Sequence, residues 1–123
     1  MKRARKLVCA AVALQVVFGL GIVWAEEGEM FSAEGEIVDM ACYVSREAKG
    51  PDNAGCAKSC VKNGQPMGLL GDDGTLYLLY ASHKDGAPFE AAKDHAGSKV
   101  QVSGTLSTTA GVKGIEVSAV KAL

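Results

Sequence analysis

The sequence predicts an all-β domain with one or two short helices, and three observations support this fold class. Five short segments after residue 30 have the composition or the apolar–polar alternation of strands. Glycine-rich turns separate several of them. Two other short segments carry helix signals, each with a glycine close behind it. The first 25 residues have a different character.

Residues 1–25 have the pattern of a secretory signal peptide. Four basic residues lie within the first six positions, and the next 19 residues carry no charge. The uncharged run is also about long enough to span a bilayer, so an uncleaved anchor is the alternative. Val23 and Ala25 match the small or β-branched residues that a signal peptidase requires, which favours cleavage after Ala25. We therefore expect a periplasmic or secreted protein with one domain over residues 26–123 and no membrane attachment after cleavage.

Removal of this segment changes the charge of the chain. The whole sequence has 13 basic and 14 acidic residues, and the segment contains four of the basic ones and none of the acidic ones, so the remaining domain has a net charge of −5. Binding to nucleic acid through phosphate contacts requires a basic face. Neither the charge nor any cluster of lysine and arginine supplies one, so we expect no nucleic-acid partner. A domain of this size is also marginally stable unless a disulfide or a metal helps it.

Three strand signals come before the second helix. Residues 31–42 space apolar side chains around Gly35, which is a typical bulge position. Residues 65–70 lead into a second strand, and residues 75–80 form a third. The sequence Gly-Asp-Asp-Gly at 71–74 joins them as a hairpin turn.

An insertion that carries two cysteines lies between the first and second strands. Turn-forming residues predict a loop over 45–55. Residues 56–62 then indicate a short helix that stops at an Asn-Gly pair. Cys56 and Cys60 are four residues apart, so they share one face of this helix.

The C-terminal part of the chain predicts a helix and two more strands. Residues 88–96 suit a helix, with proline in the first turn and Gly97 directly after the end. Residues 99–106 alternate apolar and polar side chains, and residues 115–120 form the last strand after a hairpin loop.

The resulting order is strand, strand, strand, helix, strand, strand, with bulge-type glycines at Gly35 and Gly104. This is the order of the five-stranded OB-fold barrel. Residues 99–121 resemble the closing hairpin of small exported bacterial OB-fold proteins, and the cysteine-bearing insertion between strands one and two distinguishes this chain among them. The resemblance implies an OB-fold-like barrel and export, and it implies no particular activity.

Removal of the signal peptide leaves an odd number of cysteines: Cys42, Cys56 and Cys60. The first strand ends at Cys42 and the second begins near Met67, so the insertion starts and finishes at one corner and its thiols converge there with Cys42. In a meander of strands the end of the third strand reaches the same corner, which makes His83 the expected fourth metal ligand. His95 is expected to be a solvated residue at a helix end, where the helix dipole favours it.

Three interpretations of the cysteines stay open. Three thiolates and one imidazole form a known zinc set, and sulfur also suits copper(I), with Met40 and Met67 as nearby thioethers. The spacing, however, is not the paired Cys-x2-Cys of strong zinc signatures. A disulfide from Cys42 to Cys56 or Cys60 is the second interpretation, and it stabilises the domain by about 3 kcal/mol in the chain-entropy model. A redox role for Cys56 and Cys60 is the third, although their spacing is not Cys-x-x-Cys.

The favoured function is an exported, non-enzymatic OB-fold binding module whose cysteine-rich corner binds either a ligand or a soft metal, zinc or copper, with a protein or a small ligand as the partner. The alternatives are a structural or partner-binding domain with one disulfide and a spare thiol, and a thiol-redox protein. No Ser/His/Asp set and no spacing of paired carboxylates predicts catalysis, so no catalytic or cofactor-binding residues are assigned.

Overall fold

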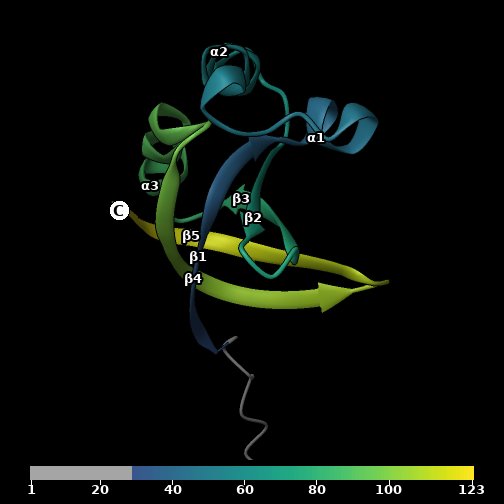
Figure 1. Cartoon of the computed structure of the whole chain (residues 1–123). Helices are drawn as coiled ribbons and strands as arrows, with labels where there is room; N and C mark the ends of the chain where they lie inside the picture. Colours follow the sequence, from purple (N-terminus) through teal and green to yellow (C-terminus); the bar gives the residue numbers. More distant parts are fainter. Residues whose placement is uncertain (1–28) are drawn as a thin grey trace, which may run out of the picture.

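The predicted strands close into a barrel in which the neighbours follow the order β1-β2-β3-β5-β4 (Figure 1). The computed structural model describes residues 29–123, so the expected signal peptide lies outside the described residues. The strands are β1 (Met30–Asp39), β2 (Met67–Gly71), β3 (Leu76–Ala81), β4 (Lys99–Thr109) and β5 (Val112–Ala122). All neighbouring strands are antiparallel except β3 and β5, which run parallel. The predicted all-β, OB-fold-like barrel is therefore confirmed.

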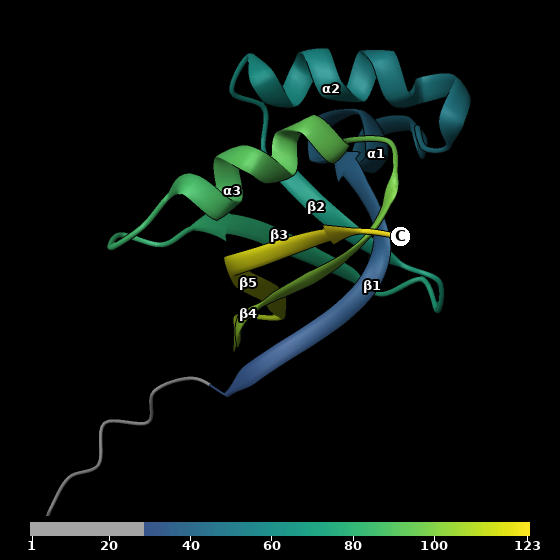
Figure 2. The same ribbon diagram turned by 90° about the vertical axis from the view of Figure 1, so that its left-hand side faces the viewer.

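Three short helices accompany the barrel. They are α1 (Met40–Arg46), α2 (Ala54–Lys62) and α3 (Ala87–Ala92), with 3-10 turns before α2 (Pro51–Asn53) and after α3 (Lys93–His95). Figures 1 and 2 both show α1 and α2 side by side over the end of the barrel where β1 finishes. Helix α2 is the predicted cysteine-bearing helix between β1 and β2, whereas α1 occupies a stretch that the sequence pattern assigns to the first strand and the following loop.

Strand β1 ends three residues earlier than predicted because its last residue caps a helix. The Asp39 side-chain Oδ1 accepts a hydrogen bond from the backbone N–H of Ala41 at 3.0 Å, which satisfies one of the free donors of the first turn of α1. The N–H of Met40 donates to the carbonyl of Pro66 at 2.9 Å, so the start of α1 is tied to the segment that enters β2. Cys42 consequently lies in a helix and not at a strand end.

Both predicted bulge glycines lie at close contacts between strands. At Gly35, where β1 pairs with β2 on one side and β4 on the other, an added Cβ would collide with the carbonyl oxygen of Leu70. At Gly104 an added Cβ would collide with the carbonyl of Glu116, and the β4–β5 register shifts between Ser103 and Gly104. The shift at Gly104 is the predicted bulge, which lets the long strand bend around the barrel.

The hydrophobic core of the barrel includes side chains of α2. Fully buried aliphatic side chains from every strand fill the interior, among them Ile37, Leu69, Leu79, Val102 and Ile115. Ala57 and Val61 of α2 belong to the same cluster and are also buried. The seating of these two side chains, one turn apart, fixes the rotation of α2 about its own axis.

Gly97 sets the position of the start of α2. Its φ is +82°, a left-handed conformation that glycine adopts without strain. Its N–H donates to the carbonyl of Ile37 at 2.7 Å, and its Cα lies so close to Ala54 that an added Cβ would overlap that residue. The first turn of α2 therefore rests directly on the backbone at residue 97.

Candidate metal centre

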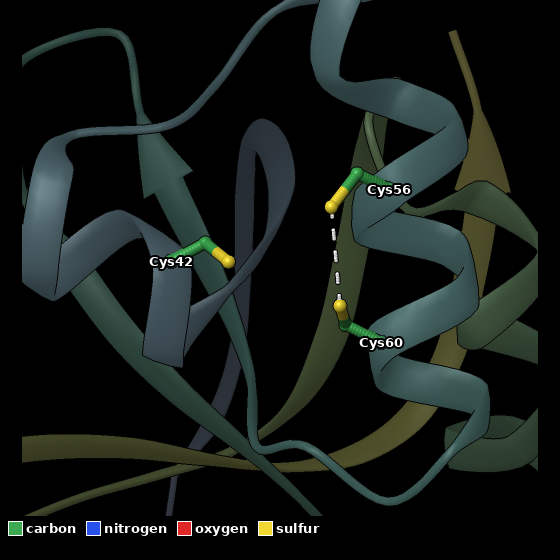
Figure 3. A group of neighbouring side chains, drawn as sticks. All are labelled: Cys42, Cys56 and Cys60. Atoms are coloured by element: carbon green, nitrogen blue, oxygen red, sulfur yellow. Dashed lines mark hydrogen bonds between the residues drawn. The ribbon is translucent and has the colours of Figure 1, made fainter.

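The three predicted cysteines converge between α1 and α2. Cys42 comes from α1, and Cys56 and Cys60 come from one face of α2, so that their side chains point toward one another across the gap between the helices (Figure 3). The three sulfur atoms all lie within 4.8 Å of one another. The Sγ atoms of Cys56 and Cys60 are 4.0 Å apart. The prediction that the insertion brings these thiols to one corner is confirmed.

Local packing explains why these side chains meet. Cys56 and Cys60 each precede one of the buried residues Ala57 and Val61 by one position, so the burial of that pair directs the two thiols along the flank of α2. Cys42 lies in the first turn of α1, which the Asp39 cap and the Met40 hydrogen bond to Pro66 hold in place. Each thiol is thus positioned by its own anchored helix.

The separation of the sulfurs fits shared ligation and does not fit a covalent bridge. A disulfide has a sulfur–sulfur distance of about 2.05 Å, and all three cysteines of the described residues are free thiols. Tetrahedral zinc with Zn–S bonds of about 2.3 Å places its sulfur ligands about 3.8 Å apart. The Cys56–Cys60 distance of 4.0 Å is close to this value. The cluster can therefore hold a metal ion with small side-chain movements.

The three cysteines and the neighbouring Asp39 differ in their exposure to solvent. Cys56 is exposed, Cys42 and Cys60 are half-buried, and Asp39 at the end of β1 is only 1% exposed. Asp39 adjoins both half-buried thiols, and its carboxylate is the main cause that raises the pKa of Cys42. Burial raises the pKa of Cys60 to about 11, and Cys56 and Asp39 add to this effect.

One cation opposes the accumulation of negative charge. The Nη2 of Arg46 donates a hydrogen bond to the sulfur of Cys42 at 3.3 Å, and Arg46 acts to lower the pKa of that thiol. The net direction for Cys42 is nevertheless upward. Without a metal ion, Cys42 and Cys60 therefore favour the protonated thiol.

The structure does not bring the predicted fourth ligand, His83, into this group. The end of β3 does lie beside the start of β2, because Leu79 pairs with Met67, as the meander argument requires. After Ala81, however, the chain turns toward α3 and β5, where Ser82 lines a small hollow with residues of those elements. His83 is exposed in this turn and is not among the clustered ligand atoms.

The two candidate thioethers have packing roles. Met67 is fully buried in the barrel core. The sulfur of Met40 lies against Gly68 on β2, in the space that a side chain at residue 68 would occupy. Both positions follow from the barrel, because Met67 pairs with Asp39 at the end of β1 and Met40 directly follows Asp39.

Sequence reasoning missed Asp39 and Arg46. The available signal for Asp39 was its residue type, because an aspartate directly after an apolar strand segment is a favoured helix N-cap. The role of Arg46 can be predicted only when α1 is known to be a helix. Arg46 follows Cys42 by four residues and therefore neighbours it on one helix face.

Comparisons of the chain with protein-family models, with curated proteins and with solved structures found no match. The expected likeness to small exported OB-fold proteins therefore stays a prediction, which rests on the order of the elements and on the closing hairpin. Within residues 29–123, no helix combines the length and the apolar character needed to cross a membrane.

Proposed function

We propose that the protein is an exported, non-enzymatic OB-fold module that binds one zinc or copper(I) ion through Cys42, Cys56 and Cys60. The observation that carries the proposal is the convergence of three free thiols, from two separately anchored helices, within 4.8 Å. Sulfur ligands suit these two ions among the common biological metals. Because Cys56 is an exposed residue, a bound ion would be accessible to a partner protein or a small ligand.

The electrostatics of the site support metal binding more than a redox-active role for Cys42 or Cys60. A redox-active cysteine works as a thiolate and needs a lowered pKa, whereas the pKa values of Cys42 and Cys60 are both raised. A bound cation reverses this situation, because it stabilises the thiolates that otherwise repel one another and the Asp39 carboxylate. The arrangement is thus suited to receive a positive ion.

Export is the other part of the proposal. It is supported by the basic start, the uncharged run and the small residues before Glu26. Outside the cytoplasm a cluster of three thiols is prone to oxidation. A bound metal ion protects the thiolates by occupying their lone pairs, so export and metal binding are compatible.

The test is thiol counting and metal analysis on protein that has been expressed as the full chain and recovered from the periplasm. Three thiols that react only after chelation, with one metal ion per chain, are expected. One thiol without metal would instead support the domain with a disulfide, and a pair of thiols that cycles under mild reductant would support the redox protein.

Single substitutions provide the controls. Cys42→Ser, Cys56→Ser and Cys60→Ser are each expected to lower metal affinity at least about 100-fold, more than loss of an outer-sphere contact does. Ser59→Ala is the matched control, because Ser59 is an exposed residue of α2 directly beside Cys60. It should bind metal like the unchanged protein.

A further inference from the structure

One buried oxygen at the metal centre lacks a partner. Among the residues described, Asp39 Oδ2 is the sole buried side-chain oxygen or nitrogen that makes no hydrogen bond. The other oxygen, Oδ1, is engaged by the N–H of Ala41 as the cap of α1. A buried charged oxygen is strongly unfavourable unless a donor or a cation meets it. A partner for Oδ2 is therefore expected, either a proton on the neighbouring thiols of Cys42 and Cys60 or a metal ion that takes the place of these protons.

Asp39 lies on the inner side of the thiol cluster. It is the last residue of β1 and directly precedes α1, and it neighbours the half-buried thiols of Cys42 and Cys60. Cys56, the exposed member, lies toward solvent. An ion held by the three sulfurs would therefore have the exposed Cys56 on its solvent side and the buried Asp39 on its inner side.

We propose that Asp39 supplies the fourth ligand through Oδ2, so that the site is a three-thiolate, one-carboxylate centre that prefers divalent zinc to monovalent copper. This inference rests on the proposed metal-binding function and extends it to the identity of the ion. It also replaces His83, which lies in the turn after β3, with a residue that adjoins the half-buried thiols. The Asp39 carboxylate must move toward the ion, because it lies outside the group of ligand atoms that are within 4.8 Å of one another.

Charge and ligand chemistry both favour a divalent ion here. Three thiolates and one carboxylate carry four negative charges, and a divalent ion neutralises twice as much of this charge as copper(I). Carboxylate oxygen is an ordinary zinc ligand at about 2.0–2.2 Å, whereas copper(I) prefers sulfur. Copper(I) bound by the three thiolates alone would leave Oδ2 without a partner. It would also supply one positive charge where zinc supplies two.

The discriminating variant is Asp39→Asn. Its amide oxygen can still accept from the Ala41 N–H and keep the cap, while the amide nitrogen that replaces Oδ2 cannot bind a metal ion. Asp72→Asn is the matched control, because it makes the same change in the exposed turn between β2 and β3. Competition titrations with Zn²⁺ and with Cu⁺, each against a chromophoric chelator, measure the two affinities.

The expected result is a loss of zinc affinity of about 10–100-fold in Asp39→Asn, with a change in copper(I) affinity of less than about threefold, since copper(I) depends on the sulfurs. The absorption bands of Co²⁺ substituted for zinc should also shift. Asp72→Asn should match the unchanged protein in all three measurements. An Asp39→Asn protein with the original preference for zinc over copper overturns the inference.

A crystal structure of the zinc-loaded, unsubstituted protein gives a second measurement that does not depend on how the variant folds. Asp39 Oδ2 is expected about 2.0–2.2 Å from the zinc ion. Zinc on the three sulfurs with Oδ2 more than about 3 Å away refutes Asp39 as a ligand while the proposed function stands. Unsubstituted, fully reduced protein that binds neither Zn²⁺ nor Cu⁺ refutes the proposed function itself.

Discussion

The guanidinium of Arg46 donates a hydrogen bond to the sulfur of Cys42 across one turn of α1, at 3.3 Å. The two residues are four positions apart, so the helix geometry itself brings them together. Helix α1 therefore carries a proposed metal ligand, Cys42, and a counter-charge for it. This pairing stabilises the thiolate whichever metal ion occupies the site.

Arg46→Gln is expected to weaken metal binding about fivefold, equivalent to about 1 kcal/mol, because it removes a charge-assisted hydrogen bond that solvent partly screens. Competition titration against a chelator measures the change. Lys113→Gln removes one positive charge near the β4–β5 turn and is the matched control. Equal affinities for the two variants would show that Arg46 acts only through the net charge.

The raised pKa of Cys60 predicts slow alkylation of this thiol in the metal-free protein. At pH 8, iodoacetamide should react with Cys60 far more slowly than with Cys60 of the unfolded chain, because a pKa of about 11 leaves almost no thiolate. Mass spectrometry of peptides after timed quenching gives the rates. Reaction of Cys60 at the same rate in folded and unfolded protein would contradict the raised pKa.

The raised pKa of Cys60 also predicts how the stability of the metal-free, reduced protein depends on pH. The folded pKa of about 11 lies above the ordinary value of 9.0, so the folded state holds the Cys60 proton over a range in which the unfolded state has released it. The stabilisation is therefore complete below pH 9 and is lost as the pH rises from 9 to 11. Urea titrations across this range, with Cys60→Ser for comparison, should show a steeper decline for the unsubstituted protein.

Alanine substitutions at Gly97 and Gly111 distinguish two losses of stability, one from a left-handed backbone conformation and one from displacement of α2. Their φ values are +82° and +81°, but an added Cβ overlaps Ala54 at Gly97 and meets nothing at Gly111. Gly111→Ala should cost about 1 kcal/mol of unfolding free energy, and Gly97→Ala should cost about 1–3 kcal/mol more because α2 must shift. Denaturant titration measures both values.

The same pair of variants reports on the metal centre. A shift of α2 moves Cys56 and Cys60 away from Cys42, so Gly97→Ala should lower zinc affinity, whereas Gly111→Ala in the β4–β5 turn should not. Affinity that is unchanged in a destabilised Gly97→Ala protein would contradict this prediction and would show that α2 accommodates the added methyl group without moving the two thiols.

The barrel could be predicted because its signals are local. The alternation of side chains in β4, the turn at 71–74 and the glycines at 35 and 104 each depend on neighbouring residues, and together they determine the order of elements. The convergence of the thiols also followed, since the insertion has to return to the corner where β1 and β2 pair.

The proposed fourth ligand could not be predicted in the same way. The position of His83 depends on the direction that the chain takes after Ala81, which the parallel pairing of β3 with β5 decides. The role of Asp39 depends on which of its oxygens caps α1 and which stays free. Both are properties of the assembled corner and leave no trace in residue spacing.

Cleavage of the N-terminal segment has a direct spectroscopic consequence. Trp24 is the single tryptophan of the chain and lies within residues 1–25, whereas the three tyrosines lie beyond them. Exported protein should therefore show tyrosine emission without tryptophan emission, and its intact mass should begin at Glu26. Ala25→Phe supplies the control, because a bulky residue at the cleavage position blocks the peptidase and keeps Trp24 on the chain. Tryptophan emission from the unsubstituted exported protein would mean that the segment remains as an anchor and that the metal centre works at the membrane surface.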